Sequence, residues 1–182
     1  MSARTMTTRI ILGVLIFGLS KAAHAEVLSA DQNGFSVSHA VSSTAAPESV
    51  YKAMINNIDK WWNPDHSWSL KAENLYMRAE VGGCFCEHLP ELGEGAGVEH
   101  LRIISLRPNT EIRFDGALGP LQAMPIQGRM VWKIDAQESG SSITFTYMVH
   151  GFLETGLEGF APAVDGVIAE QAERLAAHLN QN

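Results

Sequence analysis

The chain has 182 residues, 46% of them hydrophobic, and a formal net charge of −7 at pH 7. Residues 1–25 contribute three positive charges and no negative ones, so residues 26–182 carry a net charge of −10. An acidic chain without a basic stripe argues against nucleic acid or an anionic membrane surface as the partner. The length suits one domain with a proper hydrophobic core.

Residues 1–25 have the pattern of a secretory signal peptide. Arg4 and Arg9 precede an apolar run over residues 10–19, and Ala23-His24-Ala25 has the small-x-small form of a cleavage site. The competing interpretation is an uncleaved membrane anchor, but ten apolar residues are fewer than the roughly 20 that cross a bilayer. We expect cleavage before Glu26, release into the periplasm or outside the cell, and no stable membrane span afterwards.

The first part of the mature chain is expected to hold one strand and two short helices. Residues 26–33 look like a mobile lead-in, and alternation from Gly34 to Val41 predicts the first strand. Apolar residues recur at helical spacing from Val50 to Ile58 after a Pro47-Glu48 start. Asn56-Asn57 predicts a break before a second helix over residues 58–62.

Six more strand-like segments follow with only turn residues between them, which favours antiparallel pairing. They cover residues 75–79, 84–89, 98–106, 111–114, 126–136 and 143–149. An amphipathic pattern over residues 155–180 predicts one long final helix. A curved sheet around a single helix leaves space between them, so this order predicts a container for an apolar small molecule.

Several segments carry a resemblance to a known superfamily. They are Trp61-Trp62 with residues 64–68, Gly82–Glu87, Gly116–Pro120 and Asp165–Leu175. Over residues 34–180 the chain resembles the START / birch-pollen-allergen-like (SRPBCC) superfamily. Within it, the chain is most similar to the bacterial branch of polyketide-cyclase-like and Hsp90-ATPase-activator-homologue-like proteins.

The resemblance implies an α+β helix-grip fold, in which a curved seven-stranded antiparallel sheet wraps round a long C-terminal helix. Two short helices would follow the first strand. Members bind lipids, sterols, polyketides or aromatic compounds between sheet and helix, and a minority catalyse cyclisation, dehydration or hydrolysis there. They share no catalytic motif, so no catalytic residue is carried over. The Hsp90-activating role fits badly with an exported chain.

Aromatic and aliphatic residues are the candidate ligand contacts. Three indoles lie within eight residues, and we expect Trp62 and Trp68 near the cavity entrance, although packing in the core is the alternative. Alternation within the strands and the final helix suggests the remaining wall. These residues are Phe85, Leu101, Phe114, Trp132, Phe145, Tyr147, Phe160 and Val164.

Cys84 and Cys86 are the only cysteines. On an extended strand their Cα atoms would lie about 6.5–7 Å apart, near the upper limit for a disulfide. We favour packing as two free thiols. A bridge across a buckled strand and a metal site with His88 and a further histidine, His66 or His100, are the alternatives. Their spacing matches none of the common zinc patterns, and we expect no cofactor.

Glu87 and His100 are the candidate acid–base residues, because a carboxylate beside a histidine in an apolar cavity could enolise or dehydrate a carbonyl compound. A solvated Glu87 and a hydrogen-bonded His100 are the favoured alternative. Arg102, Arg113 and Arg129 are expected to face solvent, although an inward-facing arginine could clamp a carboxylate or phosphate head group. The favoured function is binding of a hydrophobic small molecule, the alternative is a cyclase or dehydratase, and a metal-binding or redox protein is the third.

Overall fold

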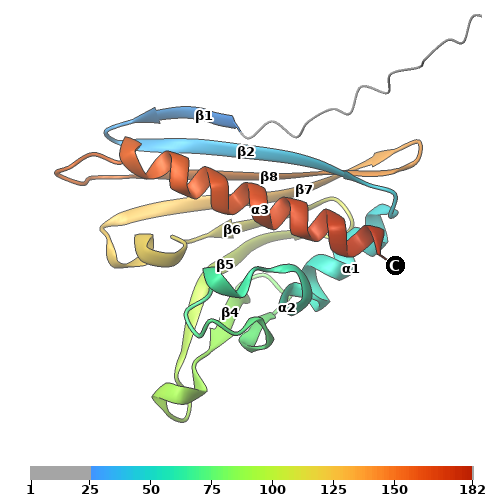
Figure 1. Cartoon of the computed structure of the whole chain (residues 1–182), viewed down its shortest axis with the longest axis horizontal. Helices are drawn as coiled ribbons and strands as arrows, with labels where there is room; N and C mark the ends of the chain where they lie inside the picture. Colours follow the sequence, from blue (N-terminus) through green and yellow to red (C-terminus); the bar gives the residue numbers. More distant parts are fainter. Residues whose placement is uncertain (1–25, 182) are drawn as a thin grey trace, which may run out of the picture.

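The computed structural model describes residues 26–181, in which eight strands form one antiparallel sheet in the order β1-β2-β8-β7-β6-β5-β4-β3 (Figure 1). The strands are β1 Glu26–Asp31, β2 Gly34–Ser43, β3 Leu75–Met77, β4 Cys84–His88, β5 Gly97–Arg107, β6 Glu111–Asp115, β7 Ile126–Gln137 and β8 Gly140–Gly151. The α-helices are α1 Pro47–Asn56, α2 Ile58–Trp61 and α3 Ala161–Asn180. Short 3-10 turns are η1 Pro64–His66, η2 Ala72–Asn74, η3 Pro90–Leu92, η4 Gly119–Ala123 and η5 Glu158–Phe160.

The element order agrees with the α+β expectation, including the break between α1 and α2 at Asn57. The sheet has eight strands rather than seven, because residues 26–31 form an edge strand instead of a mobile lead-in. The side chains of residues 27–31 are exposed, so this strand has no apolar alternation and pairs with β2 through its backbone. The long helix begins at Ala161 rather than 155, because Gly156 has a positive φ and residues 158–160 form η5.

The predicted signal peptide, residues 1–25, lies outside the described residues. None of the helices within residues 26–181 combines the length and the apolar character that a membrane span requires.

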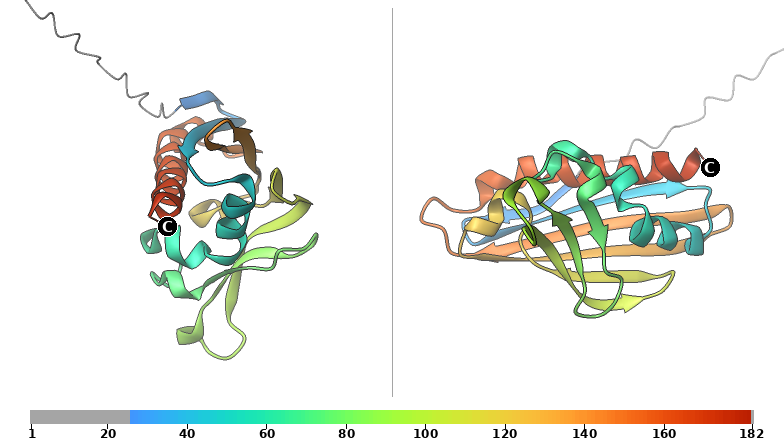
Figure 2. Two further views of the ribbon diagram at one scale, coloured as in Figure 1. Left: turned by 90° about the vertical axis from the view of Figure 1, so that its right-hand side faces the viewer. Right: turned by 90° about the horizontal axis from the view of Figure 1, so that it is seen from below.

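All three helices lie on one side of the sheet, which curves around them (Figure 2). Figure 1 shows α3 crossing β2 and β8 diagonally, while β6, β5 and β4 turn away from it. Helices α1 and α2 cover the part of the sheet beside the C-terminal end of α3. The other half of α3 has no neighbouring α-helix among the described residues.

An aromatic cluster fills the space beneath α1 and α2. The fully buried Trp61 ring lies 5.5 Å from Trp132, which stacks on Phe145 at 4.9 Å and meets Phe114 edge-on at 4.8 Å. Each such pair adds about 0.5–1.5 kcal/mol beyond simple burial. The cluster therefore holds the two short helices firmly against the sheet.

Polar contacts attach α3 to the rest of the molecule. His39 of β2 and Asp165 of α3 form a largely buried pair with 2.7 Å between Nε2 and Oδ1. Farther along, the Arg174 guanidinium donates to the Trp61 carbonyl, and the Gln171 side chain accepts from the Asn63 backbone N–H. These contacts fix the position of the helix along the sheet.

We predict that Asp165→Ala lowers the free energy of unfolding by about 1–3 kcal/mol, because it leaves buried His39 without its partner. The matched control is Glu173→Ala, an exposed carboxylate on the same helix, which should change stability little. Urea denaturation of both variants measures the difference. Equal, small effects would show that the His39–Asp165 pair contributes nothing.

Candidate ligand cavity

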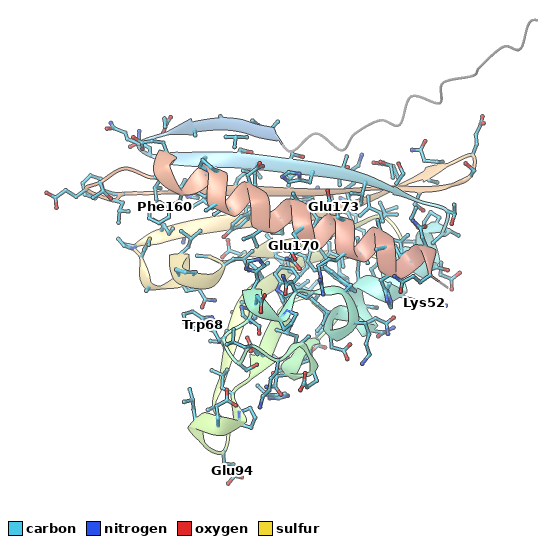
Figure 3. All side chains as sticks on the ribbon, in the orientation of Figure 1. Lys52, Trp68, Glu94, Phe160, Glu170 and Glu173 are labelled. Atoms are coloured by element: carbon cyan, nitrogen blue, oxygen red, sulfur yellow. A yellow bond between two sulfur atoms is a disulfide. The ribbon has the colours of Figure 1, made fainter. Side chains whose placement is uncertain are left out.

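A cavity of about 490 Å³ lies between the N-terminal half of α3, η4 and the loop that carries Trp68. Figure 3 labels Phe160 at the start of α3 and Trp68 below it, on the segment that leaves η1. The wall is mostly apolar. It comprises Trp62, Asp65, His66, Ser67, Trp68, His100, Leu118, Gly119, Pro120, Leu121, Tyr147, Phe160, Ala163, Val164, Val167 and Ile168.

The structure places the ten predicted ligand residues in two groups. Half of them line this cavity: Trp62, Trp68, Tyr147, Phe160 and Val164. The other half, which are Phe85, Leu101, Phe114, Trp132 and Phe145, pack in the core instead. They face the helix side as alternation suggested, but α1, α2 and the Trp61 cluster already fill the space above most of them.

Several wall residues of the cavity are not among the ligand contacts predicted from the sequence. Val167 and Ile168 lie three and four positions after Val164 on α3. Their helical spacing from a selected residue is the signal that could have found them. Leu118 and Leu121 come from the irregular connection before β7, and no periodic pattern marks them.

A β-bulge brings His100 to the concave face. Phe85 pairs with Leu101 and Cys86 with Glu99, so His100 is an extra residue in β5. In a regular strand, His100 would point to the face opposite its buried neighbour Leu101. The bulge changes the direction of the His100 side chain, so that both residues can be buried. His100 is instead only 4% exposed, its ring lies 4.7 Å from Phe85, and it forms part of the cavity wall.

Glu87 and His100 form a buried hydrogen-bonded pair. The Glu87 side chain is inaccessible to solvent, and its Oε2 lies 2.9 Å from His100 Nε2. The same carboxylate accepts the backbone N–H groups of Trp68, at 2.9 Å, and Ser69, at 2.6 Å. The expectation of a solvated Glu87 is therefore wrong. The expectation of a hydrogen-bonded His100 is confirmed.

The two side chains have opposite charge preferences. Burial alone would raise the pKa of Glu87, but the hydrogen bonds from Ser69, Trp68 and His100 outweigh it and lower the pKa. Burial lowers the pKa of His100 more than the neighbouring carboxylate raises it. Near neutral pH the pair is thus an ionised Glu87 and a neutral His100.

Tyr147 connects the cavity to η4. Its hydroxyl donates to the Gly116 carbonyl at 3.2 Å and accepts the Leu118 N–H at 3.0 Å. Gly128 lies directly beside the ring, where a side chain would collide with it. Burial raises the pKa of Tyr147 well above its ordinary value, so the hydroxyl remains protonated. Tyr147 fixes the connection that forms one wall.

Cys84 and Cys86 form a disulfide, with their Cα atoms 5.4 Å apart. The favoured expectation of two packed thiols is wrong, because β4 is shorter here than the extended strand assumed for it. Cys84, Cys86 and Glu99 do bring three metal-ligand residue types together, but bonded sulfurs supply no thiolate. His88 lies apart from them, stacked on Tyr76 at 4.3 Å.

The three arginines face solvent, as expected. Arg102 pairs with Glu99, Arg113 with Glu111 and Arg129 with Asp115, and each arginine side chain is about half exposed. None of them lines the cavity. They supply no clamp for an anionic head group.

Comparisons with known proteins identify the fold. No family model matches the chain, and no curated protein matches it in sequence. Solved structures do match. An uncharacterized protein from Rhizobium leguminosarum has a TM-score of 0.60 at 17% identity, covering 85% of this chain and 98% of that one. The Aha1 dimer from Colwellia psychrerythraea has a TM-score of 0.56 at 18% identity, covering 80% and 96%.

DynU16, from the dynemicin biosynthetic locus, has a TM-score of 0.53 at 14% identity, covering 79% of this chain and 46% of that one. The fold is of the helix-grip type. Identities this low extend to architecture alone, so the function has to be argued from the cavity itself.

We predict that acidification destabilises the protein partly through His100. Between the ordinary histidine pKa of 6.5 and its lower value in the fold, the unfolded chain binds a proton that folded His100 does not. The free energy of unfolding should therefore fall as pH falls through this window. In His100→Gln the decline should be shallower, because this proton is no longer taken up. Glu87 contributes a further decline between the ordinary glutamate pKa of 4.5 and its own lower pKa, where the unfolded chain binds a proton that folded Glu87 does not.

Urea titrations at several pH values, on wild type and His100→Gln, measure this difference. The other histidines contribute equally to both proteins, so they cancel. Parallel pH dependences would contradict the assigned charge state of His100.

We predict that a reductant lowers the stability of the oxidised protein by about 1–2 kcal/mol, the entropy expected for so short a closed loop. A double variant, Cys84→Ala with Cys86→Ala, should show no response to the same reductant. Urea denaturation with and without reductant measures the effect, and alkylation followed by mass spectrometry counts the thiols. Two free thiols in the untreated protein would contradict the bridge.

Proposed function

We propose that this chain is an exported protein that binds a hydrophobic or aromatic small molecule in the cavity beneath the N-terminal half of α3. The observation that carries the proposal is the cavity wall. Indole, phenol, phenyl and aliphatic side chains surround a space of about 490 Å³, within the range of ordinary ligand pockets of about 300–1,000 Å³.

The exposure of Trp68 supports an entrance at that residue. Half of its side chain is accessible to solvent, whereas Trp62, on the same wall, is only 3% exposed. A flat ligand entering beside Trp68 would exchange water for contact with both indoles.

Export is supported by two independent features. The signal-like pattern of residues 1–25 is one, and the Cys84–Cys86 disulfide is the other, because disulfides persist mainly in oxidising compartments. The periplasm or the extracellular space is therefore the proposed location. Detection of a mature chain beginning at Glu26 in the exported fraction tests this part.

A second candidate function, a cyclase or dehydratase, is favoured by the Glu87–His100 pair. A neutral histidine oriented by a buried carboxylate is a competent general base, and His100 lines the cavity. Glu87 would hold the ring in position rather than contact the substrate. Time-resolved chromatography with mass analysis of a bound polyketide-like carbonyl compound distinguishes the two functions, because it detects a cyclised isomer as well as a dehydrated product, whereas a carrier returns the compound unchanged.

We predict that the exported protein, purified without detergent, carries an added mass of a few hundred daltons in native mass spectrometry. Val164→Trp should abolish this mass by filling the cavity beside α3. The matched control is Val81→Trp, at a position 68% exposed and outside the wall, which should retain it.

Binding of an environment-sensitive hydrophobic dye to protein stripped of ligand provides a second measure of access to the cavity. The dye should bind wild type and Val81→Trp, and bind Val164→Trp at least about tenfold more weakly, since a blocked pocket forfeits most of the apolar burial. Dye binding that is equal in all three proteins would place the hydrophobic site elsewhere.

A further inference from the structure

His100 gives the cavity wall a hydrogen-bond acceptor, because its partner Glu87 determines which ring nitrogen carries the proton. The Glu87 carboxylate is ionised and can only accept, so the His100 Nε2 atom facing it must carry the proton. In a neutral imidazole the other nitrogen, Nδ1, then holds a lone pair and accepts. The tautomer thus follows from the partner.

Nδ1 is free to receive a ligand. Among the described residues no hydrogen bond reaches it, and it is not among the side-chain atoms that are enclosed without a partner. The Phe85 ring lies 4.7 Å from the imidazole and the Glu87 carboxylate bonds its Nε2, while His100 contributes to the cavity wall. The exposed part of this ring therefore presents an acceptor.

Two other polar side chains on the wall, Tyr147 and His66, are already engaged with partners. The Tyr147 hydroxyl already gives its single proton to the Gly116 carbonyl. The His66 Nε2 lies 3.1 Å from Glu170, which also accepts from Asn63. A ligand carboxylate would find no cation there and would lie close to the negative charge of Glu87.

We propose that the cavity selects apolar or aromatic ligands bearing a hydroxyl donor, such as a phenol or an enol, whose O–H donates to His100 Nδ1. This inference rests on the proposed binding function and narrows its ligand class. A matched ether keeps the ring and loses the donor, and a matched carboxylate adds a charge that the cavity does not compensate. One neutral hydrogen bond favours the phenol over the ether roughly fivefold.

The test uses three probes with one ring system: hydroxypyrene, methoxypyrene and pyrenecarboxylate. Their affinities for ligand-stripped protein, residues 26–182, are measured by fluorescence at about pH 7. We expect hydroxypyrene to bind roughly fivefold more tightly than methoxypyrene, and pyrenecarboxylate to bind most weakly. His100→Leu removes the acceptor altogether, so it should bring the ratio of the first two near one. His88→Gln, at a histidine outside this wall, should leave the ratio unchanged.

Nitrogen-15 NMR of the wild-type protein provides a readout that needs no variant to fold. His100 should show the neutral Nε2–H tautomer, and hydroxypyrene but not methoxypyrene should shift its Nδ1 signal in the direction of hydrogen-bond acceptance. Equal affinities for the phenol and the ether, or an unmoved Nδ1 signal, would overturn this inference and leave the binding function intact. Failure of all three probes to bind would overturn both.

Discussion

One helix has to cover a sheet that is too wide for it. Eight strands spaced about 4.8 Å apart span roughly 34 Å, whereas an α-helix with its side chains is about 10–12 Å across. Helix α3 packs chiefly on β2, so the rest of the concave face needs other cover. At one end α1 and α2 provide it through Trp61, and at the other only η4 and the Trp68 loop are present. The cavity lies beneath the N-terminal half of α3, over the part of the sheet that α1 and α2 do not cover, and its position follows from this geometry.

The Glu87 carboxylate holds two parts of the cavity wall in place, the Trp68 loop and the His100 ring. Glu87 orients His100 from one side, and it accepts the consecutive N–H groups of Trp68 and Ser69 from the other. The loop turns back immediately afterwards through Leu70, which has a φ of +57°, an unfavourable conformation for a side chain of this type. The hydrogen bonds to Glu87 offset that cost. Any change in the charge of Glu87 therefore affects the position of Trp68 as well as the tautomer of His100.

Sequence patterns predicted most of the fold and only part of the site, for physical reasons. Strands β2, β7 and β8 each bury one face, and alternation locates them within a few residues. In β4, Cys84 to Glu87 are all buried, so alternation carries no information about which side chains face the cavity. The extra residue that turns His100 inward has no sequence signal. Alternation predicts the correct face for Phe114 and Trp132, but only packing decides whether a residue on that face contacts a ligand or another ring.

The Cys84–Cys86 disulfide in β4 lies opposite the bulge in β5, and both distort the pairing of these two strands in the same way. Between Cys84 and Cys86 the bridge brings the Cα atoms to 5.4 Å, where an extended strand would hold them about 6.5–7 Å apart. Opposite them β5 contains one residue more than its partner, namely His100. A shortened β4 against a lengthened β5 is the geometry of a bulge, so the bridge stabilises the distortion that places His100 beside Glu87. An oxidising compartment would then favour not only the stability of the hairpin but also the assembly of the polar pair at the cavity wall.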